Sequence, residues 1–306
     1  MRILVTGGAG FIGSHVVETY VAAGHDVRVI DNLSTGRRAN ITKDVHFYEL
    51  DIHSNETARV FEDFQPEVVN HLAAQASVKL STGDPAHDLE VNGGGTARIV
   101  DLAVRNGVKK VIYSSTGGAL YGDPDFVPVP ETHPIRALSP YGTSKRVGEL
   151  YLDLYQRTHG LNYTILRYAN AYGPRQDPHG EAGVCAIFTG LMLGGMQCTI
   201  DGDGEQQKDY VYVGDIARAN LLALQAGDGQ ALNIGTGRGV SVNEIFSTLQ
   251  TATGSTTPAR HGPPRSGDVR NIWLDSSLAK AVLGWEPEVS FAQGIQAAVD
   301  WLRASS

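Results

Sequence analysis

The sequence has few cysteines and no long apolar run, and both absences exclude classes of protein. Cys185 and Cys198 are the two cysteines of the 306 residues, and they form no CxxC pair. We therefore expect neither a disulfide framework nor a metal site, and two reduced thiols are typical of a cytoplasmic protein. No stretch approaches the roughly 18 uncharged apolar residues of a membrane-spanning helix. Glycines interrupt the apolar N-terminal run after Thr6, which favours a strand over a signal peptide.

The sequence also lacks a basic tract. Its formal net charge is −8, and Arg37-Arg38 is the densest basic pair early in the chain, so nucleic-acid binding is not expected. A small anionic ligand could still be held by local Arg and Lys residues and by helix N-termini. The length suits a doubly wound sheet with a smaller second unit.

Strand-like and helix-like segments alternate through the first part of the chain. We predict strands over 2–6, 27–31, 45–50, 67–71, 108–115 and 162–167. We predict helices over 11–23, 55–64 and 84–106, and from Ser139 onward, with Gly93-Gly94-Gly95 an awkward interruption of the third. Such alternation predicts an α/β fold with a doubly wound parallel (Rossmann) sheet and right-handed crossovers. We assign residues 1–170 to a dinucleotide-binding domain, to which later segments could return, and 171–306 mainly to a smaller C-terminal substrate-binding lobe.

A glycine motif lies between the first strand and the first helix. Gly7 permits a tight turn, Gly10 lets the backbone approach a pyrophosphate, and Gly13 lets the helix pack closely on the strand. The N-terminus of the helix then directs its unpaired N–H groups at the phosphates. The motif and its context predict dinucleotide binding.

Two acidic strand ends refine the prediction. Asp31 ends the second strand, where a carboxylate accepts hydrogen bonds from ribose hydroxyls and repels a phosphate, so we predict NAD rather than NADP. Arg37 and Arg38 could weaken that preference. Asp51 and Ile52 follow the third strand and could touch the adenine; alternatively, Asp51 is an ordinary polar residue at a strand end.

A second motif places a tyrosine and a lysine on one helical face. Ser139 is a good N-cap and Pro140 suits the first helical position, so Tyr141 and Lys145 lie one turn apart. A free phenol has a pKa of about 10, and a nearby ammonium or the positive nicotinamide ring of NAD would favour the phenolate. Thr116, at the carboxyl end of a central strand, could hydrogen-bond the reacting oxygen. The alternative is a tyrosine that caps a core beside a solvated lysine.

With these motifs, the sequence resembles the extended short-chain dehydrogenase/reductases, and among them the UDP-glucose 4-epimerase group. The resemblance covers nearly the whole chain. The matching stretches are TGGAGFIGSH (6–15), DNLSTG (31–36), HLAAQASV (71–78), SSTGGALYG (114–122), SPYGTSK (139–145), LRYANAYGPRQ (166–176), KDYVYVGDIA (208–217), NIGTG (233–237) and LGWEP (283–287).

The resemblance implies roles for individual residues. The catalytic residues would be Thr116, Tyr141 and Lys145. The cofactor-binding residues would be Gly7, Gly10, Phe11, Ile12, Gly13, Asp31, Asn32, Asp51, Ile52, Leu72, Ala73, Ala74, Asn92, Tyr141, Lys145 and Tyr168. The substrate-binding residues would be Thr116, Asn170, Lys208, Arg265 and Asp268, the last two holding the pyrophosphate and the uridine ribose.

Three residues depart from the pattern of the family. Lys208 replaces a usual arginine, and a lysine cannot make the bidentate contact that suits a diphosphate. Gly93 replaces a usual valine after Asn92, which could loosen that helix. Ile272 lies near a position that helps to set pocket size, and its branched chain argues against N-acetylated sugars.

The residues after Thr116 select among the reactions of such enzymes. Relatives that dehydrate or decarboxylate usually carry an acid there, whereas this chain has Gly117-Gly118, which offer no group for a second proton transfer. We therefore expect 4-epimerisation. Tyr141 takes the 4-hydroxyl proton while hydride passes from C4 to NAD. The 4-keto sugar then swings about the diphosphate linkage, and hydride returns to its opposite face.

Several partners and alternatives follow from the same resemblance. The expected substrate is a UDP-sugar, most simply UDP-glucose or UDP-galactose, and UDP rather than dTDP rests on the resemblance alone. Epimerisation of a uronate, a pentose or an N-acetylhexosamine, or a non-catalytic NAD-sensing role, are the alternatives. The family commonly dimerises through two helices per subunit, here those around 84–106 and 140–158.

Overall fold

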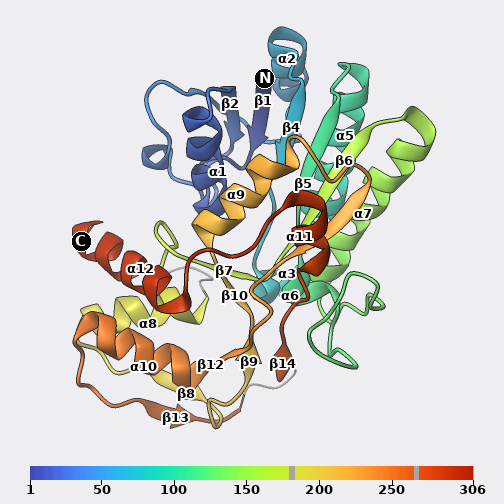
Figure 1. Ribbon diagram of the computed structural model, residues 1–306. Coiled ribbons are helices and arrows are strands. Elements are labelled where there is room, and N and C mark those ends of the chain that lie inside the picture. The colour runs from blue at the N-terminus through green and yellow to red at the C-terminus, as the bar shows by residue number, and fades with distance from the viewer. Residues whose placement is uncertain (179–182, 265–268, 306) are drawn as a thin grey trace.

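A seven-stranded parallel sheet forms the centre of the molecule (Figure 1). The structure is a computed structural model that describes residues 1–178, 183–264 and 269–305. The strand order is β11-β6-β5-β4-β1-β2-β3, and every neighbouring pair is parallel. The strands are β1 (Arg2–Thr6), β2 (Asp26–Asp31), β3 (His46–Glu49), β4 (Val68–His71), β5 (Lys110–Thr116), β6 (Asn162–Tyr168) and β11 (Gln230–Ile234). The predicted doubly wound α/β fold is confirmed.

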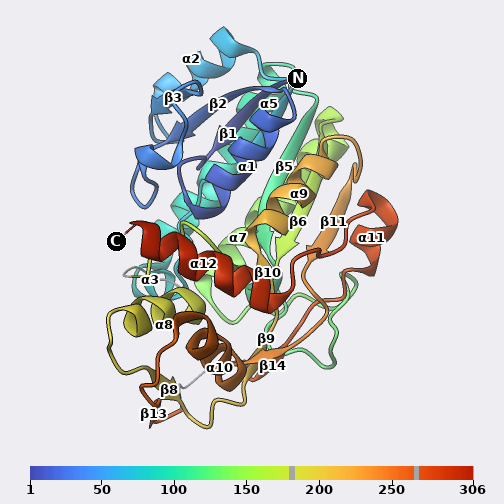
Figure 2. The same ribbon diagram turned by 60° about the vertical axis from the view of Figure 1, so that its left-hand side comes forward.

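Helices cover both faces of this sheet, as Figure 2 shows. Helices α1 (Phe11–Ala22) and α9 (Val213–Ala223) lie on one face, and α2 (Asn55–Phe64), α5 (Gly95–Arg105) and α7 (Pro140–His159) lie on the other. Successive side chains of a strand point to opposite faces. Accordingly, Ile3 and Val5 belong to the core under α1 and α9, and Leu4 to the core under α2, α5 and α7.

The segment predicted as one helix over 84–106 is helical throughout but has three parts. They are α4 (Pro85–Leu89), a π-helical turn over Glu90–Gly94, and α5. We expect Gly93 to loosen this helix, and it lies in the π-helical turn, where the regular α-helix is interrupted. A Cβ on Gly93 would lie 3.1 Å from Val147 of α7, so the missing side chain lets the two helices approach closely.

After β6 the chain builds a smaller lobe next to the carboxyl ends of the central strands (Figures 1 and 2). Its core includes Phe188, Ile245, Leu249 and Val299. Its elements are β7 (Asn170–Tyr172), α8 (Val184–Leu193), β8 (Thr199–Asp201), β9 (Gln207–Lys208), β10 (Tyr210–Tyr212), β12 (Val240–Ser241), α10 (Val242–Thr253), β13 (Arg260–Gly262), β14 (Asn271–Ile272) and α12 (Phe291–Ser305).

Short helices complete the described chain. They are the 3-10 turn Arg38–Asn40, α3 (Val78–Gly83), α6 (Gly117–Leu120) and α11 (Ser277–Leu283). Across the described ranges, no helix has both the length and the apolar character needed to cross a bilayer.

Candidate active site

Thr116, Tyr141 and Lys145 meet at the carboxyl edge of the central sheet. Thr116 is the last residue of β5, and its hydroxyl caps α6 by accepting from the Ala119 amide at 3.2 Å. The Ser139 hydroxyl caps α7 in the same way, which places Tyr141 and Lys145 in its first turns. The Thr116 side chain lies close enough to the Tyr141 phenol to lower its pKa by hydrogen bonding. The predicted catalytic residues therefore form one cluster.

Burial dominates the electrostatics of Tyr141 and Lys145. It raises the pKa of Tyr141 to about 12, with a further rise from the Asp88 carboxylate, against a lowering by the hydrogen bond to Thr116. Burial also lowers the pKa of Lys145 to about 7, although Glu149 and Asp88 favour its charged form. We expected the Lys145 ammonium to lower the pKa of the phenol below its usual value. Within the protein itself, the loss of water around the phenol outweighs any such effect.

Asp88 is a buried carboxylate that the sequence prediction missed. It accepts a hydrogen bond from the Ser144 hydroxyl at 2.5 Å, and others from the side-chain amides of Gln75 at 2.7 Å and Asn92 at 3.2 Å. Ser144 lies between Tyr141 and Lys145 in the chain, so Asp88 braces the catalytic turn of α7. Its spacing of four residues before Asn92 was the signal available in the sequence.

Glu149 is a second buried carboxylate beside the catalytic turn. It accepts hydrogen bonds from the Ser115 hydroxyl at 2.7 Å, from Arg167 at 2.9 and 2.8 Å, and from Arg146 at 2.7 Å. Burial opposes its charge, but the hydrogen bonds from Arg167 hold the pKa of Glu149 below its usual range. Glu149 follows Lys145 by four residues, the same spacing that links Lys145 to Tyr141.

The glycine turn has the shape of a phosphate cradle. Gly7 has a φ of +71°, and a Cβ there would lie 2.5 Å from the Ala73 amide nitrogen. A Cβ on Gly13 would overlap the Gly7 carbonyl, so the helix packs against the turn only because position 13 is glycine. No side chain caps the N-terminus of α1, which leaves its first N–H groups for an anion. These features fit a dinucleotide pyrophosphate.

Asp31 holds the same turn from the end of β2. Its carboxylate accepts from the Ala9 amide at 2.9 Å and from the Leu33 amide at 2.8 Å. Burial raises the pKa of Asp31, and these amide hydrogen bonds favour its charged form. The residue thus shapes the turn and offers a negative charge at the predicted ribose site.

Both arginines near this turn already have partners as the chain is folded. Arg37 pairs with Asp177 at 2.5 Å. Arg38 donates to the Ile41 carbonyl at 2.9 Å and its guanidinium lies 4.8 Å from the centre of the Phe47 ring. We considered that these arginines could weaken the preference for NAD, and their contacts argue against that.

The other predicted cofactor residues lie at the ends of neighbouring strands. The Asn32 amide donates to the Asp51 carboxylate at 2.8 Å, so these two side chains form one edge of the site. Ile52 is buried under α5, where Gly95 leaves room for it. Leu72, Ala73 and Ala74 follow β4, which lies beside β1 in the sheet.

Asn92 and Tyr168 both act through buried hydrogen bonds. The Asn92 amide donates to the Gln75 carbonyl at 2.9 Å and to the Ser144 hydroxyl at 3.0 Å, which ties the loop after β4 to α7. The Tyr168 hydroxyl bonds Ser114 at 3.0 Å and Asn220 at 2.9 Å. That hydroxyl therefore faces the core, and a contact of Tyr168 with the cofactor stays a prediction.

The predicted substrate residues are only partly brought together. The Asn170 amide donates to the Asp209 carbonyl at 3.0 Å, and the Lys208 ammonium donates to the Val269 carbonyl. Arg265 and Asp268 lie outside the described residues. Ile272 is 2% exposed and belongs to the buried cluster that also includes residues of α1 and α9, so its side chain is packed within the protein.

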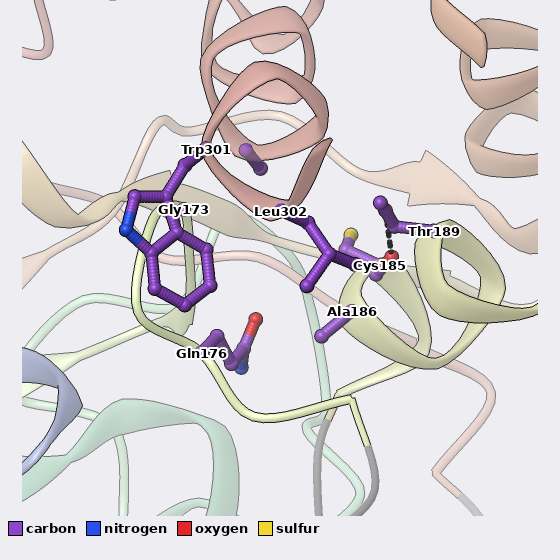
Figure 3. A pocket seen from close by; sticks show the side chains of 8 residues that line it. Gly173, Gln176, Cys185, Ala186, Thr189, Trp301 and Leu302 are labelled. Atoms are coloured by element: carbon purple, nitrogen blue, oxygen red, sulfur yellow. Dashed lines mark hydrogen bonds between the residues drawn. The ribbon is translucent and has the colours of Figure 1, made fainter. Parts of the chain in front are cut away.

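A small hollow lies between α8 and α12, apart from this cluster (Figure 3). Gln176, Cys185, Thr189 and Trp301 are among its lining residues. It contains none of the predicted catalytic or cofactor residues, so we do not assign the active site to it.

Comparison with known proteins identifies the class. The model of the NAD dependent epimerase/dehydratase family matches residues 3–235, and the chain belongs to this family. A UDP-glucose 4-epimerase of Mycolicibacterium smegmatis is 43% identical over 312 residues that span 100% of both chains.

Solved structures extend the likeness to the whole fold. A UDP-glucose 4-epimerase of Thermotoga maritima, solved with UDP-glucose, has a TM-score of 0.98 and 51% identity over 100% of this chain and 99% of its own. A UDP-glucose 4-epimerase of Thermus thermophilus, solved with NAD, has a TM-score of 0.95 and 45% identity over 100% of each chain. The predicted family and the NAD cofactor are thereby confirmed.

Proposed function

We propose that this chain interconverts UDP-glucose and UDP-galactose by epimerisation at C4 of the sugar. The observation that carries the proposal is the cluster of Thr116, Tyr141 and Lys145 beside a dinucleotide cradle. Relatives at 43% and 51% identity that bear the name UDP-glucose 4-epimerase support this substrate.

In this proposal Tyr141 moves the proton. Its phenolate accepts the 4-hydroxyl proton, and the neutral phenol returns that proton to the same sugar oxygen when the ketone is reduced. Thr116, beside Tyr141, orients this oxygen. The Lys145 ammonium holds the cofactor ribose and adds a positive charge next to the phenolate.

The cofactor supplies the redox part of the reaction. When bound, NAD accepts hydride from C4 and gives it back, so the reaction has no net oxidation. Gly7, Gly10 and Gly13 form the pyrophosphate cradle and Asp31 binds the adenosine ribose. UDP binding by Asn170, Lys208, Arg265 and Asp268 remains part of the proposal.

Epimerisation is favoured over dehydration because the side chains next to Thr116 offer no free proton donor. Gly117 and Gly118 offer no proton donor. Asp88 and Glu149 are the carboxylates identified beside the catalytic turn, and both are held by hydrogen bonds within the protein. Since neither of these two carboxylates is free for a second proton transfer, return of hydride is the simplest fate of the ketone.

The test is direct. Purified protein with NAD is incubated with UDP-galactose, without a reductant, and the anomeric protons are followed by NMR. We expect UDP-glucose to appear until the ratio of the two sugars is constant. No change in the sugar, or a build-up of NADH equal to the substrate consumed, would contradict the proposal.

We also propose a cytoplasmic homodimer. Both thiols are buried and unpaired in the described structure, which suits a reducing compartment. Leu89 on α4 and Leu150 and Leu154 on α7 are exposed apolar side chains, and these helices contact each other. Such a patch fits a second copy of the chain.

A further inference from the structure

Tyr113, on β5, contacts both the ammonium and the backbone carbonyl of Lys145. The Lys145 ammonium lies 4.4 Å from the centre of the Tyr113 ring. The Tyr113 hydroxyl donates to the backbone carbonyl of Lys145 at 3.3 Å. Both residues are buried, and a cation is attracted to the face of an aromatic ring most strongly where water is excluded. Among the described residues, no hydrogen bond from the Lys145 ammonium is found, so the face of this ring is a direct contact of the ammonium within the protein.

The ring of Tyr113 is fixed in place from two directions. His71 stacks on it with a centroid distance of 5.8 Å, and His71 is itself held by Thr6 at 2.6 Å. On the side of α7, a Cβ at Gly148 would overlap the Tyr113 hydroxyl. The glycine therefore admits the ring under the helix, and these contacts hold the ring beside Lys145.

The charges around Lys145 leave its protonation finely balanced. Asp88 faces it from α4, Glu149 from α7 and His71 from β4. Glu149 is shared with two arginines. Burial lowers the pKa of His71 to about 3, so this ring is neutral at pH 7 and adds no second cation. Since burial brings the pKa of Lys145 to about 7, a modest attraction decides whether it is charged.

We propose that Tyr113 is a positioning residue whose ring holds the Lys145 ammonium in place and keeps it protonated during the reaction. The proposal rests on the catalytic role of Lys145 given above. It assigns to β5 a second contribution to the site, beside that of Thr116.

The test changes the charge distribution of the ring and keeps its shape. Tyr113→Phe keeps the negative charge of the ring face. Difluorophenylalanine at position 113 weakens that charge, and pentafluorophenylalanine inverts its sign. Both are introduced by amber suppression. Lysine side chains carry carbon-13, and the Lys145 signal is identified by its loss in Lys145→Met. Each full-length variant is titrated by NMR, and its kcat is measured against pH. NAD binding and circular dichroism establish that each variant is folded.

The sign of the expected change follows from the charged state of Lys145. The ammonium is present below its pKa, and a weaker attraction lowers that pKa. We expect Tyr113→Phe to match the wild type and the fluorinated rings to lower the pKa in steps, by about one unit in all. The fall of kcat at alkaline pH should move to lower pH by the same amount.

The outcomes separate the two proposals. A pKa of Lys145 that is equal in all ring variants would overturn the role of Tyr113. A pKa that shifts while the pH profile of kcat stays fixed would leave the interaction standing and remove Lys145 from the catalytic step, which would contradict the proposed function instead.

Discussion

At the scale of the residue, the reaction depends on a phenol that the protein holds neutral. With its pKa raised to about 12 by burial, Tyr141 needs the positive nicotinamide ring of bound NAD to become a base at pH 7. We expect Tyr141→Phe to lower kcat by about 10²- to 10⁴-fold, the usual contribution of a general base, with little change in NAD affinity. Tyr155→Phe, further along α7, is the control. Steady-state kinetics and NAD titration check this, and an active Tyr141→Phe enzyme would remove the tyrosine from the mechanism.

Asp31 combines two tasks in one carboxylate. Asp31→Asn should weaken NAD binding at least tenfold and lower thermal stability, because hydrogen bonds to a charged group are worth about 1.5–3 kcal/mol each. NADP should still bind poorly, since Arg37 is paired with Asp177. Calorimetric titration with both cofactors measures this, with Asp26→Asn at the exposed start of β2 as the control. Unchanged NAD affinity in Asp31→Asn would place the ribose elsewhere.

At the scale of the element, the close packing of α7 on β5 depends on the absence of a side chain at Gly148. Gly148→Ala would place a methyl group on the Tyr113 hydroxyl. We expect a loss of about 1–3 kcal/mol from overpacking and lower activity, because α7 carries Tyr141 and Lys145. Adding Tyr113→Phe should recover part of the loss. Gly94→Ala, where no atom lies near the new Cβ, is the control, and urea unfolding measures the four proteins. Equal stability of Gly148→Ala and the wild type would show that the helix can shift freely.

The parts of the site that could be predicted from the sequence are those formed within one helix, strand or turn. A glycine turn, a strand end and a capped helix start are local patterns, so the sequence was sufficient to predict that Thr116, Tyr141 and Lys145 would meet. For Asp88, the sequence offered only the spacing before Asn92. The contacts of Tyr113 with Lys145 and of Asp177 with Arg37 join residues that are far apart in the sequence, and no local pattern predicts them. The direction of the Tyr141 pKa was likewise hidden, because burial depends on packing by the whole chain.

At the scale of the whole molecule, the site is built within one chain, while α7 also carries an exposed apolar face. Leu154→Lys would place an unpaired charge in the proposed interface, and burying such a charge costs several kcal/mol. We therefore expect a dimer for the wild type and a monomer for Leu154→Lys in sedimentation experiments. Met196→Lys, an exposed apolar position elsewhere, should remain a dimer.

The activity of that monomer then tests how far the interface supports the site. Thr116, Tyr141 and Lys145 need no residue from a second copy, so a folded monomer should epimerise UDP-galactose. Yet Leu154 and Lys145 share one helix, and loss of the partner would free α7 to move on β5. We expect kcat to fall by less than that of Tyr141→Phe, with a lower melting temperature. A wild type that sediments as a monomer would contradict the dimer, and its activity would show that a single chain is the working unit.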